Sequence, residues 1–219
     1  MSDFIVPVKA KPKNVTTIIL GALSAYRNKQ LGPVSLANVG ESTLISKQLS
    51  VVNTVFPLSE TFLVTGYYAQ SVLNNKPEGL RIIENQMYEN SGNAEEIKLA
   101  INATLNDKIL IMNGNVLPSK ESMIQIKNHG SCILVKDEES DEVGSNVFSG
   151  KMEILAYGLK YRWYNIVMLQ SNEVNILKKF VNKKDKARYY LHEILNYIVN
   201  HGGVINVVKT NNKIEVIDK

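Results

Sequence analysis

The stretch Val15-Thr16-Thr17-Ile18-Ile19-Leu20 decides the fold of this 219-residue chain. It is a short run of β-branched and apolar residues that ends at Gly21, which is the pattern of a strand buried on both faces. Apolar residues then recur at helical spacing over Glu41–Val55 and predict an amphipathic helix. A buried strand followed by a helix is the unit from which parallel sheets are built.

The strand-and-helix order continues along the chain. Further strands are predicted at Thr61–Thr65, Arg81–Glu84 and Lys108–Met112, and further helices at Ala69–Leu73 and Asn93–Leu105. This alternation predicts an α/β fold of three layers, with helices on both faces of the sheet. Ligands of such folds bind at the carboxyl ends of the strands. The loops to inspect are therefore residues 21–36, 65–68, 85–93 and 113–118.

The second half of the chain has a different pattern. Strands with glycine-containing turns are predicted at Ser131–Lys136, Asn146–Ser149, Met152–Tyr157 and Tyr161–Leu169, which makes this half of a mixed sheet rich in antiparallel pairs. Two helices, Asn172–Val181 and Ala187–Asn200, and a terminal pair of strands, 204–208 with 214–217, complete the chain. We interpret the acidic run 137–142 as a hairpin tip, and Trp163 with Tyr161 as packing residues on one strand face.

Composition indicates a globular protein. With 44% apolar residues, 13 Gly and 6 Pro, the chain is neither disordered nor collagen-like. Residues 1–14 contain Pro7 and Pro12 without periodicity, so we expect an extended arm there and a single domain over 15–219. No apolar run approaches the roughly 18 to 20 residues of a membrane-spanning helix. We therefore expect no membrane association.

Cysteine usage and the N-terminal sequence favour an intracellular location. The lone Cys132 cannot form an internal disulfide, and the N-terminus lacks a signal-peptide pattern, so a cytoplasmic or otherwise intracellular protein, or part of a virion, is expected. The net charge is +4, and six basic residues fall within Lys178–Arg188. We interpret that segment as a solvated connection between two helices and expect no specific nucleic-acid partner. His129, His192 and His201 lack metal-ligand spacing.

Several short motifs together resemble a known family, the sugar-phosphate and choline-phosphate nucleotidyltransferases with a Rossmann-like core. The first family loop reads Leu-Ala-Ala-Gly-x-Gly-x-Arg and is followed by Pro-Lys. This chain has Leu20-Gly21-Ala22-Leu23-Ser24-Ala25-Tyr26-Arg27, then Pro33-Val34. The family strand end Val-Thr-Gly-Tyr is matched by residues 64–67, and Asn-Gly-Asp-Val by Asn113-Gly114-Asn115-Val116. The family triplet Glu-Ile-Asp near the end resembles Val216-Ile217-Asp218.

The resemblance implies positions for a nucleotide and a metal. Enzymes of this family join a nucleoside triphosphate to a phosphate-bearing substrate and release pyrophosphate. The family's nucleotide loop falls on Gly21, Ala22, Leu23, Ser24, Ala25, Arg27, Val34 and Asn93. The two positions that hold magnesium in the family fall on Asn115 and Asp218. Arg27, Asn115 and Asp218 are therefore the vestiges of the catalytic set.

Four of these positions depart from the family pattern. Leu23 and Ala25 replace glycines that let the backbone approach phosphates, Val34 replaces a lysine, and Asn115 replaces an aspartate. We therefore expect a catalytically degenerate site with no catalytic residue, no metal and no cofactor, and weak or absent nucleotide binding. The resemblance then leaves a binding or structural module with protein partners in a larger assembly, such as a viral particle or a multiprotein complex.

An active enzyme is the alternative. In that hypothesis the chain transfers a nucleoside monophosphate to a sugar phosphate or phosphocholine. Arg27 and Lys29 would hold the triphosphate, and Asp218 with a nearby carboxylate would hold Mg²⁺.

Overall fold

The computed structural model describes residues 15–22 and 32–217. The main sheet contains β1 (Val15–Leu20), β4 (Ser59–Thr65), β5 (Leu80–Glu84), β6 (Lys108–Asn113), β8 (Cys132–Asp137), β9 (Val143–Phe148), β10 (Lys151–Tyr157), β11 (Tyr161–Gln170) and β12 (Asn206–Lys209). Its nine strands follow the order β5-β4-β1-β6-β11-β8-β12-β10-β9. Two small sheets pair β7 (Val116–Pro118) with β13 (Ile214–Val216), and β2 (Asn38–Val39) with β3 (Ser42–Thr43).

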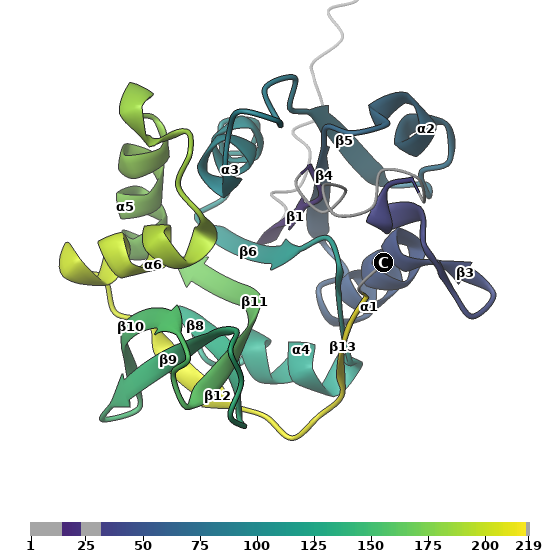
Figure 1. Cartoon of the computed structure of the whole chain (residues 1–219). Coiled ribbons are helices and arrows are strands. Elements are labelled where there is room, and N and C mark those ends of the chain that lie inside the picture. The colour runs from purple at the N-terminus through teal and green to yellow at the C-terminus, as the bar shows by residue number, and fades with distance from the viewer. Residues whose placement is uncertain (1–14, 23–31, 218–219) are drawn as a thin grey trace, which may run out of the picture.

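Six α-helices occur in the described part of the chain. They are α1 (Leu44–Val55), α2 (Ala69–Asn74), α3 (Asn93–Ile101), α4 (Lys120–Lys127), α5 (Asn172–Val181) and α6 (Leu191–Asn200). Figure 1 shows α3 and α5 on one side of the strands and α1 and α4 on the other. None of the helices in residues 15–22 and 32–217 has the length and apolar character needed to cross a bilayer.

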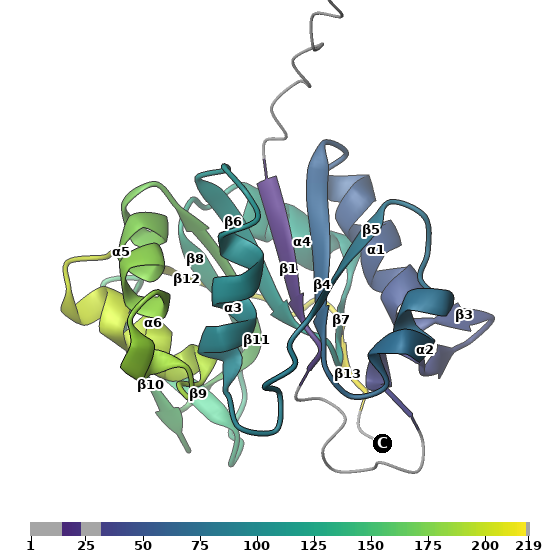
Figure 2. The same cartoon turned by 90° about the horizontal axis from the view of Figure 1, so that it is seen from above.

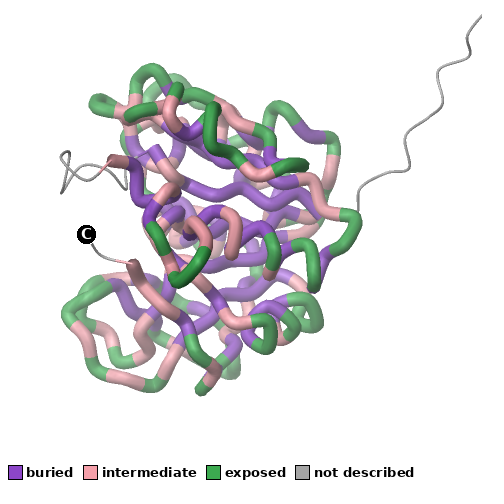
Figure 3. The backbone as a smooth tube through the Cα atoms, turned by 90° about the vertical axis from the view of Figure 1, so that its right-hand side faces the viewer, coloured by how far each residue is buried: buried purple, intermediate pink, exposed green. Residues whose placement is uncertain are grey.

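Strand β1 lies at the centre of the parallel part of the sheet. It pairs in parallel with β4 on one side and with β6 on the other, and all six of its residues are buried. Figure 3 shows that buried segments run through the middle of the molecule and exposed ones lie around them. Its side chains alternate between two cores, because Ile18 contacts the apolar cluster that includes α3, α5 and α6, while Ile19 contacts the one that includes α1 and α4. The predicted parallel core and the mixed α/β class are confirmed.

Two predicted helix starts are wrong. The first helix begins at Leu44 instead of Glu41, because the Thr43 hydroxyl accepts a hydrogen bond from Ser46 N (3.4 Å) and caps the helix there. The last helix begins at Leu191 instead of Ala187, and Glu193 accepts a hydrogen bond from Tyr190 N (2.8 Å) at its start.

Helix α4 was not predicted. Its signals in the sequence are the N-cap Ser119, whose hydroxyl accepts from Ser122 N (3.2 Å), and two buried apolar residues one turn apart, Met123 and Ile126. So short an apolar stripe is hard to separate from a loop.

The predicted terminal pair of strands is also wrong. Strand β12 pairs in parallel with β8, and β13 pairs in antiparallel with β7. The two strands therefore belong to different sheets. Their separation lets β13 cover β7, while β12 fills the place between β8 and β10 in the main sheet.

The acidic run 137–142 is not a hairpin tip. Strands β8 and β9, which it joins, are not neighbours, since β9 pairs with β10 and β11. Glu138 within this run accepts hydrogen bonds from Tyr164 Oη (2.6 Å) and Arg162 Nη1 (3.1 Å). The hydrogen bond from Tyr164, together with the hydrogen bond and the positive charge of Arg162, holds the pKa of Glu138 below its ordinary value. The Trp163 prediction is confirmed, because this residue is buried in the core and Tyr161 packs against the same cluster.

A side chain from α6 completes the edge of β10. Strands β10 and β12 share a single residue pair, Lys151 with Asn206. Further along β10, Leu155 N donates to Asn196 Oδ1 (2.7 Å), and Asn196 Nδ2 donates to Leu155 O (2.8 Å). The amide of Asn196 thus forms the two hydrogen bonds that a neighbouring strand would form.

The substitution Asn196→Ala should lower the free energy of unfolding by about 1–2 kcal/mol, because it leaves the Leu155 N–H and C=O without their partners. Urea unfolding measures this loss. The matched control is Asn200→Ala, at an exposed position of the same helix, which should change stability by less than about 0.5 kcal/mol. Equal losses in the two variants would contradict the role of Asn196.

Candidate functional site

The candidate site lies where β1, β4 and β6 end. Leu20 of β1 is paired with Val64 of β4 on one side and with Asn113 of β6 on the other, so the three strands end at the same edge of the sheet. Gly21 N donates to Val64 O (2.9 Å), and Gly114 N donates to Leu20 O (2.7 Å). Figure 2 shows β7 and β13 beside this edge of the sheet. This edge, at the carboxyl ends of parallel strands, is where the sequence analysis expects the site.

Gly21 is required by close packing. A Cβ at this position would press against the Leu63 side chain and lie 2.9 Å from Val64 O. Of the other predicted loop residues, Leu23, Ser24, Ala25 and Arg27 lie outside the described residues, as do Lys29 and Asp218.

Ala22 is bound to a buried carboxylate. Its N–H donates to Glu96 Oε2 (3.0 Å), while Glu96 Oε1 accepts from Asn93 Nδ2 (3.2 Å). Glu96 belongs to α3 and is fully buried. The structure therefore brings together two predicted positions, Ala22 and Asn93, through a residue that was not predicted.

The environment of Glu96 favours its neutral form. Burial raises the pKa of Glu96 to about 7, although hydrogen bonds from Ala22, Asn93 and Gly21 lower it. The groups that shift this pKa are all neutral. At neutral pH the carboxyl group is therefore divided between its two protonation states.

Residues 187–190, which connect α5 to α6, accept hydrogen bonds from the N-terminus of α3. Gly92 N donates to Ala187 O (2.8 Å), and Ala94 N donates to Tyr189 O (3.0 Å), so two N–H groups at the helix start have backbone partners. Asn93 Oδ1 in turn accepts from Leu191 N (3.1 Å). Asn93 thus links the start of α6 to Glu96.

Val34 is part of a small apolar core. It lies in a 3-10 helix, Val34–Leu36, and is buried with Ala37 and Leu44. The partly buried Leu117 and Ile217 pack against this cluster. The position that the resemblance assigns to a lysine is therefore a packing position in this protein.

Asn115 lies in the turn between β6 and β7. Its carbonyl oxygen accepts from Ile217 N (2.8 Å), which brings the end of the described chain beside the turn. The side chain of Gln48, a fully buried residue of α1, donates hydrogen bonds to the backbone of this turn. Gln48 Nε2 donates to Val116 O (2.8 Å) and to Gly114 O (3.3 Å).

Of the two positions that the resemblance assigns to magnesium, the described residues include only Asn115. Across 15–22 and 32–217 no group of three or more His, Cys, Asp or Glu side chains could hold a metal ion. Asn115, the described member of the two implied magnesium positions, supplies a neutral amide, whereas Mg²⁺ is usually bound through carboxylates and water. The residues present therefore fit magnesium poorly.

The cysteine, the histidines and the basic segment all make contacts within the protein. Burial raises the pKa of the Cys132 thiol to about 12, which makes it unreactive as a nucleophile. His129 and His201 each place Nδ1 against the carbonyl oxygen four residues earlier, and burial lowers the pKa of His192. In the basic segment, Lys186 pairs with Asp185 (2.9 Å) and lies over the Tyr189 ring.

Sequence reasoning missed Glu96 and Gln48. A weak signal existed for both, because each lies among the apolar positions of an amphipathic helix: Glu96 next to Ile97 and four residues before Ala100, and Gln48 beside Leu49 and four residues before Val52. A polar residue on the buried face of a helix needs a partner inside the protein. The partner, however, comes from a distant part of the chain.

Glu96 should make stability depend on pH. Its pKa is about 7 when folded and near 4.5 when unfolded, so its stabilising contribution is complete below pH 4.5 and is lost as the pH rises through 7. Between pH 5 and pH 8 the free energy of unfolding of the native chain, relative to that of Glu96→Gln, should fall by roughly 2 kcal/mol. Urea unfolding of both proteins at the two pH values measures this. A difference that stays constant with pH would contradict the assignment.

Several solved structures that superpose on this chain are nucleotidyltransferases. The CTP:phosphocholine cytidylyltransferase of Streptococcus pneumoniae superposes with a TM-score of 0.76 and 15% identity over 93% of each chain. A putative glucose-1-phosphate thymidylyltransferase of Bacillus anthracis gives 0.74 and 14% identity over 92% of this chain and 89% of that one. The inositol-1-phosphate CTP transferase of T. maritima gives 0.72 and 16% identity over 93% and 89%.

Comparisons of the sequence itself with family models and with curated proteins give no match. The structural likeness therefore stands on the fold, and it extends over nearly the whole length of both this chain and its neighbours. The resemblance seen in the sequence motifs is confirmed at that level: the chain has a nucleotidyltransferase fold.

Proposed function

We propose that this protein is a nucleotidyltransferase-fold module that does not transfer nucleotides and that binds protein partners in a larger assembly. The observation that carries the proposal is the hydrogen bond from Ala22 N to Glu96 (3.0 Å). In the family, this loop offers backbone N–H groups to an anionic nucleotide. Here a buried carboxylate of the chain itself takes the N–H of Ala22, and in its ionised form it would repel a triphosphate.

The surroundings of Val34 support the same proposal. A lysine at this position would bring an ammonium group into the cluster formed by Val34, Ala37 and Leu44, where burying an unpaired charge is costly. Valine at position 34 suits this apolar cluster, whereas lysine would not. The positive charge that would offset the phosphates has no counterpart at this position.

The turn at Asn115 supports the proposal as well. Phosphoryl-transfer enzymes depend on positioning and on the neutralisation of phosphate charge, largely by metal ions. A neutral amide at Asn115 contributes no such charge. A cation bound here would lose carboxylate attraction that normally offsets its dehydration.

Catalysis is tested by pyrophosphate release. We expect none above the blank with Mg²⁺, any of CTP, UTP, GTP, ATP or dTTP, and phosphocholine, glucose 1-phosphate or inositol 1-phosphate as acceptor. The variant Asn115→Asp should remain inactive, because Leu23, Ala25 and Val34 are unchanged. An authentic cytidylyltransferase serves as the positive control. Steady pyrophosphate release by the unmodified chain would overturn the proposal and establish the enzyme alternative.

Nucleotide binding is tested separately by thermal unfolding. Millimolar nucleotide with Mg²⁺ should shift the melting temperature by less than about 1 °C, because a ligand far below its dissociation constant adds almost no stability. The variant Arg27→Ala should behave like the unmodified chain. A rise of several degrees that disappears in Arg27→Ala would instead identify a working nucleotide site.

A further inference from the structure

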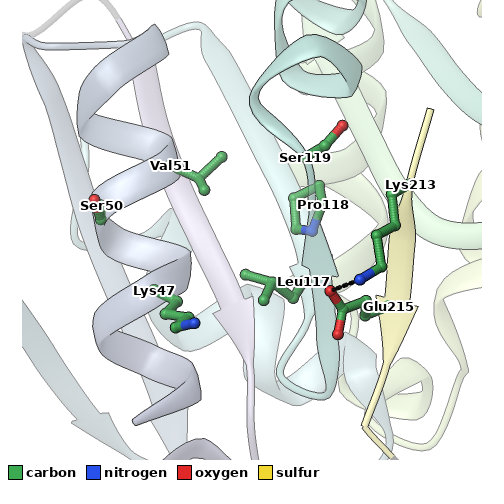
Figure 4. A pocket seen from close by; sticks show the side chains of 8 residues that line it. All are labelled: Lys47, Ser50, Val51, Leu117, Pro118, Ser119, Lys213 and Glu215. Carbon is green, nitrogen blue, oxygen red and sulfur yellow. Dashed lines mark ion pairs between the residues drawn. The ribbon is translucent and has the colours of Figure 1, made fainter. Parts of the chain in front are cut away.

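A groove lies between α1 and the small sheet of β7 and β13 (Figure 4). Its volume is about 330 Å³, at the lower end of the range typical of ligand pockets. Among the described residues, the lining comes from α1, β7, β13 and the segments next to them, and it includes neither Gly21 nor Ala22. Its floor is apolar and is formed by Val51 of α1 with Leu117 and Pro118 of β7.

The polar groups around the groove make it electropositive. Lys47 projects into it from α1 and has no carboxylate within ion-pair distance among the residues described. On the opposite side, the charge of Glu215 is offset by Lys213, with Nζ and Oε1 2.7 Å apart. Ser119, which also lines the groove, is the N-cap of α4, and the first turn of that helix carries the exposed Glu121, which offsets the helix dipole.

The backbone of β7 offers little to an added strand on the side that faces α1, because the strand is three residues long and Pro118 has no N–H to donate. Gln48 Nε2 already donates to Val116 O (2.8 Å) there, and the other edge of β7 pairs with β13. An occupant must therefore be recognised through its side chains: an apolar one against Val51 and Leu117, and an acidic one against Lys47.

We propose that this groove binds an acidic segment of a protein partner, in which a carboxylate side chain lies beside a bulky apolar one. The inference rests on the proposed function as a binding module and names the chemistry of its partner. Charge complementarity carries it, because the ammonium of Lys47 stands over an apolar floor without a carboxylate at ion-pair distance among the described residues, and so favours an anionic side chain beside an apolar one.

Selection of displayed random peptides of about twelve residues on the full chain tests the proposal. The selected sequences should be enriched in Asp or Glu next to Leu, Ile, Phe or Trp. A synthetic peptide of the enriched sequence should bind at least about tenfold more weakly to Lys47→Glu and to Ser50→Glu, which place negative charge at the groove. It should bind Lys47→Arg within about threefold of the unmodified chain.

The matched control is Lys151→Glu, which makes the same charge change at an exposed position of β10 and should leave peptide affinity unchanged. Circular dichroism melting curves confirm that each variant is folded. The proposal is overturned if no sequence is enriched, if basic peptides are selected, or if Lys47→Glu binds as well as Lys151→Glu. Pyrophosphate release by the same proteins is an independent readout, so the groove and the proposed loss of catalysis can fail separately.

Discussion

The parallel pairing of β1 with β4 and β6 is the constraint on which the rest of the structure depends. Because β1 is buried on both faces, it must be covered by helices on two sides, and its register fixes where its neighbours end. Leu20, Val64 and Asn113 are thereby brought to one level. Gly21 and Ala22, the turn at Asn115 and the start of α3 meet at this edge as a consequence.

At that edge the chain satisfies many of its own polar groups. Glu96 binds the N–H of Ala22, Gln48 binds the carbonyls of the turn, and residues 187–190 pair with the start of α3. Ligands of open α/β sheets bind at the carboxyl ends of the strands, which is this edge. A site whose donors already have internal partners has less to gain from an anionic ligand, since each new contact must replace an existing hydrogen bond.

Much of the fold could be predicted from local sequence patterns, because the β-branched strands and the amphipathic helices are long enough to show their periodicity. Strand partners could not be predicted in the same way: β12 and β13 are four and three residues long, and their partners, β8 and β7, are distant in the sequence. Within the candidate site, Val34 and Asn115 could be identified because a motif was available for comparison. Glu96 was missed, because its place among the apolar positions of α3 is only a weak signal and its partner, Ala22, is distant in the sequence.

The amide of Asn196 has a consequence beyond the stability of one strand. Where β10 diverges from β12, its backbone would otherwise present free N–H and C=O groups, which in other proteins recruit strands from neighbouring molecules. A side-chain amide caps these groups but offers no backbone of its own for a further strand to join. Helix α6 therefore prevents a strand of another molecule from pairing with β10 at this point, and this protects the folded protein from aggregation through this edge.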